Sequence, residues 1–135
     1  MISFPGRIRG ATRVHTPITL RDLPATIADV LDFNDGTRFP GASLARYWNG
    51  GETVDEEPLL SELNHARGQP EWFPVSKGNM KSLLFRGLRY IKNGDGTEEL
   101  YDFYKDPLET NNLVSSEAHR ASLAEFRALL DQSVQ

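Results

Sequence analysis

The three histidines of this sequence, His15, His65 and His119, are its first candidates for acid–base or metal chemistry. They are too scattered for a metal site, because metal-binding histidines usually stand close together or beside a carboxylate. His65 differs from the others because it opens a long loop directly after an expected strand, with Arg67 beside it. Loops at strand ends often supply pocket residues, although exposed loop histidines are also common. His65 and Arg67 are therefore candidate substrate-binding residues, and we predict no metal ligand.

Aromatic side chains could also contribute to a binding site, because an aromatic ring can stack on a sugar or an aryl group. The aromatic residues nearest to irregular segments are Tyr47, Trp48, Trp72 and Phe73. In a small protein such residues more often lie in the core, where each buries a large apolar area. We therefore predict that these four side chains are buried.

The loop that carries His65 should connect strands of a small antiparallel sheet. Residues 58–63 have the composition of one strand, and three further apolar segments follow the loop at 81–85, 88–92 and 99–103. Glycine-containing turns separate these last three segments and favour hairpins. A helix from Ser115 or Ser116 through Leu130 has one apolar face and should pack on the sheet. The expected fold class is α+β, with a sheet of three to four strands.

The N-terminal residues have a different organisation. Met1 to Phe4 are interpreted as the end of a strand, which Pro5 and Gly6 terminate in a turn. A helix should begin with Asp22 as its N-cap and present Leu23, Ile27 and Leu31 to a core. We predict three regions: a strand-turn-helix segment at 1–33, a connector at 34–58 and the sheet with its helix at 59–135.

Composition excludes several classes of function. The chain has 135 residues, which corresponds to one domain or a piece of one, and its net charge is -4. A net acid is not attracted to nucleic acid or to an anionic membrane, so we expect neither partner. The sequence contains no cysteine, which excludes a disulfide framework, a thiolate metal site and a cysteine nucleophile.

Two segments, in the same order, resemble the C-terminal part of the sulfatases, in the arylsulfatase branch of the alkaline-phosphatase-like superfamily. The first runs from residues 4–8 (FPGRI) to the helix start at 22–27 (DLPATI). The second, residues 99–113 (ELYDFYKDPLETNNL), closely resembles the family's ELYDLxxDPxExxNL ending. Between them, residues 41–44 (GASL) are similar to the family's G-x-S-L step. The resemblance implies that residues 1–33 are a remnant of a larger α/β domain.

The resemblance also implies a chemistry whose main components this chain lacks. Sulfatases hydrolyse sulfate esters with a formylglycine made from a C/S-x-P-x-R motif, assisted by calcium and by lysine and histidine side chains. Residues 3–7 match the letters of that motif. However, the motif continues to Thr-Gly, where this chain has Thr12-Arg13, and its metal-binding aspartates should precede it by tens of residues. We therefore predict no catalytic residue, and calcium is implied only for an intact sulfatase.

Two functions remain open at this point. In the first, the chain is a C-terminal fragment of a sulfatase that completes the fold and one wall of the substrate cleft and is inactive alone. His65 and Arg67 would then contact the anion or sugar of a sulfate ester bound by the intact enzyme. In the second, it is a free-standing, non-catalytic binding or interaction module derived from that domain. Full-length family members are commonly exported, which makes a periplasmic or extracellular parent enzyme an implication of the resemblance.

An uncovered apolar surface is expected near the N-terminus. In the family the strand-turn-helix segment packs on a large sheet, so its apolar side chains lack that cover here. Exposed strand edges and apolar patches favour association. We predict self-association that buries Ile2, Phe4, Leu23 and Ile27.

Overall fold

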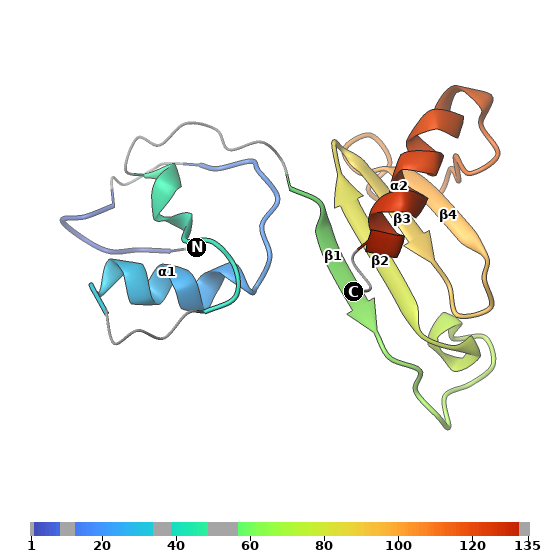
Figure 1. Cartoon of the computed structure of the whole chain (residues 1–135), viewed down its shortest axis with the longest axis horizontal. Coiled ribbons are helices and arrows are strands. Elements are labelled where there is room, and N and C mark those ends of the chain that lie inside the picture. The colour runs from blue at the N-terminus through green and yellow to red at the C-terminus, as the bar shows by residue number, and fades with distance from the viewer. Residues whose placement is uncertain (1, 9–12, 34–38, 49–56, 133–135) are drawn as a thin grey trace. The chain divides into compact units, whose positions relative to one another are not determined.

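The computed structural model describes residues 2–8, 13–33, 39–48 and 57–132 of the chain. The chain divides into two compact units, residues 1–55 and 56–135, which we describe separately (Figure 1). The first unit holds α1 (Asp22–Val30) and the 3-10 helix η1 (Leu44–Tyr47). The second holds β1 (Leu59–Leu63), η2 (Pro74–Lys77), β2 (Met80–Phe85), β3 (Leu88–Lys92), β4 (Glu98–Asp102), η3 (Glu117–His119) and α2 (Arg120–Gln132). No helix within the described ranges is long and apolar enough to cross a membrane.

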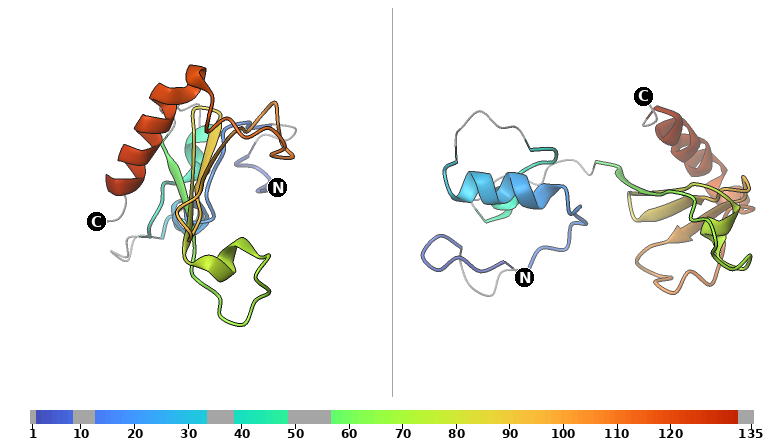
Figure 2. Two further views of the ribbon diagram at one scale, coloured as in Figure 1. Left: turned by 90° about the vertical axis from the view of Figure 1, so that its right-hand side faces the viewer. Right: turned by 90° about the horizontal axis from the view of Figure 1, so that it is seen from below.

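The strands of the second unit form an antiparallel sheet in the order β1-β2-β3-β4. Arg86 and Gly87 connect β2 to β3, and their φ angles of 47° and 74° are the positive values that a two-residue hairpin turn requires. Helix α2 lies across one face of the sheet (Figure 2). The predicted α+β fold, a sheet of three to four antiparallel strands with a C-terminal helix, is therefore confirmed, with four strands present.

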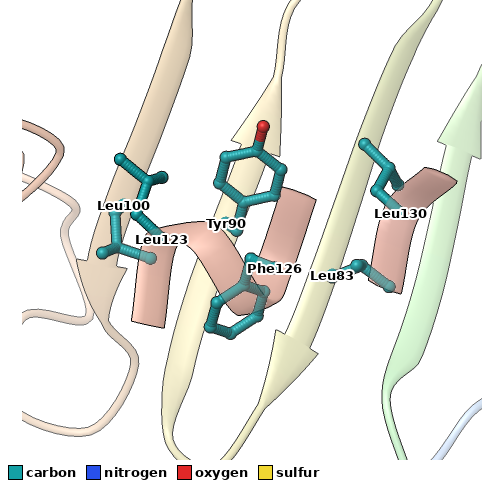
Figure 3. Packing of buried hydrophobic residues seen from close by; sticks show 6 residues of the cluster. All are labelled: Leu83, Tyr90, Leu100, Leu123, Phe126 and Leu130. Carbon is teal, nitrogen blue, oxygen red and sulfur yellow. The ribbon is translucent and has the colours of Figure 1, made fainter. Parts of the chain in front are cut away.

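The core of the second unit lies between the sheet and α2. One row of cross-strand neighbours runs through all four strands, and it consists of Leu60, Leu83, Tyr90 and Leu100. The apolar face of α2 covers this row with Leu123, Phe126 and Leu130 (Figure 3). Tyr90 and Phe126 are in ring contact, with centroids 5.8 Å apart. Each such fully buried side chain contributes about 1.5–3 kcal/mol by leaving water.

A polar cluster joins α2 to the same face of the sheet. The Tyr90 hydroxyl donates a hydrogen bond to Glu98 at 2.5 Å, and the Arg127 guanidinium donates two more to the same carboxylate. These bonds, from Arg127 first and then Tyr90, lower the pKa of Glu98 to about 2. Burial and the bond to Glu98 raise the pKa of Tyr90 well above its usual range. The cluster fixes the start of β4 to the helix.

The segment after β4 folds back on the sheet through its asparagine side chains. The Asn112 Oδ1 accepts from the Leu100 N–H at 3.1 Å and from the Val114 N–H at 3.0 Å. The Leu113 N–H then donates to the Leu100 carbonyl at 2.7 Å, which covers part of the free edge of β4. Asp106 accepts from the backbone of Thr110 and Asn111 within the preceding turn. The residues of this segment that resemble the family ending thus have a structural role.

The first unit depends on hydrogen bonds from α1 to a neighbouring loop. The Asp22 carboxylate accepts from the N–H groups of Thr19 and Ala42. The Thr26 hydroxyl donates to the Asp22 carbonyl at 2.6 Å and accepts from the Leu44 N–H at 2.9 Å. Arg7 donates to the Val30 carbonyl at 2.8 Å, so the N-terminal turn contacts the last turn of α1. The 22–27 and 41–44 segments are therefore held together by polar groups.

Three expectations for the N-terminal region are wrong. Residues 2–4 form no strand; instead, the Arg7 and Ile8 N–H groups bond to the Phe4 carbonyl in a turn. The N-cap of α1 is Arg21, and Asp22 is its first helical residue.

The third expectation concerned the face of α1. Its buried residues are Asp22 and Thr26, whereas Ile27 and Leu31 are 59% and 66% exposed. The helix turns its polar side chains inward because the loop backbone at 42–44 needs acceptors.

Much of the connector expected at 34–58 lies outside the described residues. Within residues 39–48, η1 begins after Ser43, whose hydroxyl accepts from the Ala45 N–H. Leu44 and Ala45 are buried, and η1 contacts α1. Residues 44–47 therefore pack within the first unit.

Candidate functional site

The loop between β1 and β2, residues 64–79, carries both sequence-predicted binding residues. It extends beyond the ends of these strands and is drawn in light green (Figure 2). Its second half contains η2, which begins with Pro74. Apart from Val75, which is buried, most of its side chains are exposed. The loop is therefore an accessible surface at one end of the sheet.

His65 is fixed at the base of this loop. Its backbone N–H donates to the Asn79 Oδ1 at 2.7 Å, and its ring Nε2 lies 3.1 Å from the Ser76 carbonyl. A carbonyl can only accept, so in this contact the Nε2 carries the proton. The exposed ring then has Nδ1 left for another partner. The histidine joins the two halves of the loop and keeps one nitrogen for a ligand.

Arg67 lies two residues further on and is exposed. Within the part of the chain that the structure describes, its guanidinium forms no ion pair. A free guanidinium can bind a sulfate or carboxylate through two parallel hydrogen bonds. The structure thus places His65 and Arg67 on one accessible loop, and their contact with a substrate remains a prediction.

The aromatic residues of the loop are not in a core. Trp72 is 76% exposed and Phe73 is 39% exposed, so the prediction that they are buried is wrong for both. Their ring centroids lie 4.2 Å apart with planes inclined by 32°. Tyr47 and Trp48, in the first unit, are half-buried. The loop therefore presents an aromatic pair that sequence reasoning assigned to the interior.

The β3–β4 turn supports the loop at its second end. Lys77 forms an ion pair with Asp95 at 2.9 Å. Hydrogen bonds from Thr97 and then Lys77 hold the pKa of Asp95 well below its usual range. Gly78 and Gly94 make a close backbone contact, since a Cβ on Gly94 would lie 2.3 Å from the Gly78 Cα. The turn glycines, visible in the sequence only as a hairpin signal, position the loop.

A second candidate surface is a shallow hollow of about 450 Å³ beside the β2–β3 turn. Two of its lining residues are basic, but both are paired: Arg86 with Glu125 at 3.1 Å and Lys105 with Asp102 at 3.2 Å. Neither cation is therefore free for an anionic ligand. The hollow contains none of the predicted site residues.

The described residues do not fit a calcium site. In ranges 2–8, 13–33, 39–48 and 57–132, no three histidine, aspartate or glutamate side chains converge where they could hold a metal ion. Ser3, the residue that matches the formylglycine position by letter, is exposed.

Comparison with known proteins finds sulfatases both by sequence and by structure. The sequence is 32% identical over 117 residues to a Delta 4,5-hexuronate-2-O-sulfatase of Bacteroides thetaiotaomicron, and the match includes 84% of this chain and 23% of that protein. A solved 2-O GAG sulfatase is 28% identical with a TM-score of 0.62, over 84% of this chain and 24% of that one. No family model matches the chain.

A phosphonate monoester hydrolase of Agrobacterium radiobacter has the same fold, with a TM-score of 0.61 at 21% identity over 84% of this chain and 24% of that chain. The fold alone therefore accompanies more than one kind of ester hydrolysis. The chain spans about a quarter of the length of the relatives it matches.

Proposed function

This chain is related in sequence and fold to the C-terminal portion of the sulfatases, and we propose that it completes the fold and one wall of the substrate cleft of a sulfuric ester hydrolase. The observation that carries the proposal is the extent of the match: 84% of this chain corresponds to 23% of a hexuronate-2-O-sulfatase. The segments that resemble the family ending also have structural roles, in the return of residues 112–114 onto β4. These roles suit a scaffold.

In this proposal the loop at 64–79 faces the substrate. Arg67 binds the sulfate or a sugar carboxylate, and the His65 Nδ1 accepts from a sugar hydroxyl. The similar proteins act, by their names, on hexuronate and on glycosaminoglycan sulfates. A sulfated sugar is accordingly the substrate class that we assign to the intact enzyme.

We expect this chain alone not to hydrolyse sulfate esters. The test incubates the purified chain with calcium and an aryl sulfate and measures release of the phenol. No release above buffer is the expected result. Turnover that disappears in a Ser3→Ala variant would overturn the proposal, because it would make Ser3 the source of the nucleophile.

A second candidate is a free-standing binding module that has no catalytic step. One observation favours it: the second unit encloses a core of its own, with Leu83, Tyr90 and Leu100 fully buried. The affinity of the separate chain for a sulfated oligosaccharide distinguishes the module from the cleft wall. A module should bind a sulfated oligosaccharide at micromolar concentration, whereas one wall of a cleft should need millimolar concentration, because most of the contacts would be absent.

A further inference from the structure

The Trp72–Phe73 pair is an exposed apolar surface of the second unit that lies outside its hydrophobic core. Trp72 lies in the middle of a loop between Pro70 and Pro74, with 76% of its surface in contact with water. A large apolar side chain in water gives no stability to the folded state, and exposed aromatic surface often marks a binding site. The neighbouring Phe73 ring holds Trp72 from one side, with centroids 4.2 Å apart.

The loop backbone is ordered around this pair. The Phe73 N–H donates to the Pro70 carbonyl and the Ser76 N–H donates to the Phe73 carbonyl, each at 2.9 Å. The Ser76 hydroxyl donates to the Glu71 carbonyl at 3.2 Å. Together with the His65 contact to Ser76, these bonds fix the residues on both sides of Trp72. A ligand that meets an ordered aromatic face loses less conformational entropy on binding.

We propose that the Trp72–Phe73 pair is a stacking platform for one pyranose ring of an acidic glycan. The inference rests on the proposed function, because it deepens the assignment of a sulfated sugar to this loop. A pyranose has an apolar face of C–H groups that matches the flat indole, and its hydroxyl groups lie around the rim. Glu71, which precedes Trp72 in the sequence, supplies a carboxylate that accepts from hydroxyl groups. Arg67, which forms no ion pair among the described residues, supplies a guanidinium for a sulfate or uronate.

A single sugar ring fits this surface better than a protein does. Specific protein interfaces bury on the order of 1,000 Å² or more. The pair consists of two side chains, and the loop residues that precede it, 64–71, are exposed apart from Ala66 and are mostly polar. Two rings within a polar surround suit a ligand of similar size that is apolar on one face and polar at its edge.

The test measures binding of a short heparin oligosaccharide, a sulfated glycan with uronic acid units, to the full chain. Calorimetry compares the native chain with Trp72→Ala, which should weaken binding by about tenfold or more. Trp72→Phe keeps a ring and should recover part of the affinity. Leu108→Ala is the matched control, because Leu108 is an exposed apolar residue of another loop and its loss should change nothing.

Two further variants separate stacking from charge. Arg67→Gln should weaken binding of the sulfated oligosaccharide but not binding of an unsulfated one with the same backbone. Trp72→Ala should weaken binding of both. Trp72 and Trp48 are the two tryptophans of the chain, so in a Trp48→Phe background the fluorescence reports on Trp72 alone. Saturable quenching by the unsulfated sugar is expected in that background.

Each outcome has a defined meaning. The platform is overturned if the native chain and Trp72→Ala bind the heparin oligosaccharide with equal affinity. It is also overturned if Arg67→Gln abolishes binding of both the sulfated and the unsulfated oligosaccharide. Association of two chains that Trp72→Ala abolishes would assign the pair to a second copy and also overturn it. Failure of the platform leaves the proposed function standing if the chain still releases no phenol from aryl sulfate. Conversely, measurable hydrolysis refutes the inactive wall and leaves a Trp72-dependent sugar site intact.

Discussion

The two helices of this protein use opposite kinds of contact. Helix α2 buries Leu123, Phe126 and Leu130 against the sheet. Helix α1 buries Asp22 and Thr26 against a loop and leaves Ile27 exposed. Both sequences contain apolar residues at helical spacing, and among the described residues those of α2 pack on the sheet of its own unit, whereas Ile27 of α1 is 59% exposed. An amphipathic pattern therefore identifies a helix but not the face that the fold uses.

The difference also separates the two units by what holds them together. The second unit has a cross-strand apolar row under a helix, which is a large and nondirectional source of stability. The first is held by directional bonds that Asp22 and Thr26 make to residues 42–44, each of which contributes about 1 kcal/mol. We expect the second unit to be the more stable of the two.

The largest effect should come from the core of the second unit. Phe126→Ala removes a ring that contacts Tyr90 and Phe85, and it should reduce the free energy of unfolding of that unit by about 3–5 kcal/mol. This loss of unfolding free energy is measured by urea titration, with amide exchange of β2 and β3 as the readout. Phe126→Leu, which keeps much of the volume, should cost under about 1.5 kcal/mol. Equal, small losses for both variants would show that the ring is not part of a tight core.

A smaller loss is expected in the first unit when its polar contact is removed. Thr26→Val keeps the shape of the side chain but leaves the Leu44 N–H without its acceptor, at a cost of about 1–3 kcal/mol. Thr26→Ser retains the hydroxyl and serves as the matched control. Amide exchange at Leu44 should quicken in the valine variant and change little in the serine variant. Protection at β2 and β3 should be the same in both, since the units have separate cores.

Glu98 should give the second unit a measurable dependence on pH. Its pKa is lowered to about 2 in the fold, mainly by the Arg127 hydrogen bonds, against an ordinary value of 4.5. A lowered carboxyl pKa contributes stability that is present above the ordinary value and is lost as the pH falls towards 2. Glu98→Gln should therefore remove about 1 kcal/mol at pH 6 and much less at pH 3.

The measurement is the urea midpoint of the second unit at both pH values. Glu62→Gln is the control, because Glu62 occupies the same row of the sheet but its side chain is 52% exposed in its pair with Lys81. Its effect should be small at both pH values. Identical pH profiles for the native chain and Glu98→Gln would contradict the role of this carboxylate.

Much of the second unit could be predicted from local sequence. Alternating apolar residues such as Leu83 and Tyr90 mark one face of a strand, and glycine-containing turns fix where strands end. These signals depend on near neighbours, which the sequence displays directly. The strand boundaries at β2, β3 and β4 accordingly agree with expectation within one residue.

The parts that could not be predicted depend on distant partners. Asp22 was expected as a cap, but its bond to Ala42 spans 20 residues and turns that face of α1 inward. Trp72 was expected in a core, and the residues beside it in the sequence do not indicate that its side chain is 76% exposed. His65 was correctly placed on a loop, whereas its contacts to Ser76 and Asn79 required the closed shape of that loop. Local patterns cannot specify such contacts.

The smallest expected change in stability concerns the exposed face of α1. Ile27→Ser should alter the free energy of unfolding of the first unit by under about 0.5 kcal/mol, because Ile27 is 59% exposed. The same substitution should nevertheless reduce self-association, which we continue to propose for this surface. Of the four residues assigned to it, Ile2 and Ile27 are exposed, whereas Phe4 and Leu23 are half-buried. The first two should therefore contribute most.

Light scattering at high protein concentration provides the measurement. The native chain should show a mass that rises with concentration, and Ile27→Ser should lower that mass at every concentration. Leu108→Ala is again the control, since it removes exposed apolar area from the second unit. A strictly monomeric native chain would refute self-association. An equal reduction by both variants would mean that any exposed leucine or isoleucine supports self-association. The exposed face of α1 would then have no specific role, and the contrast between α1 and α2 would be limited to the residues that each helix buries.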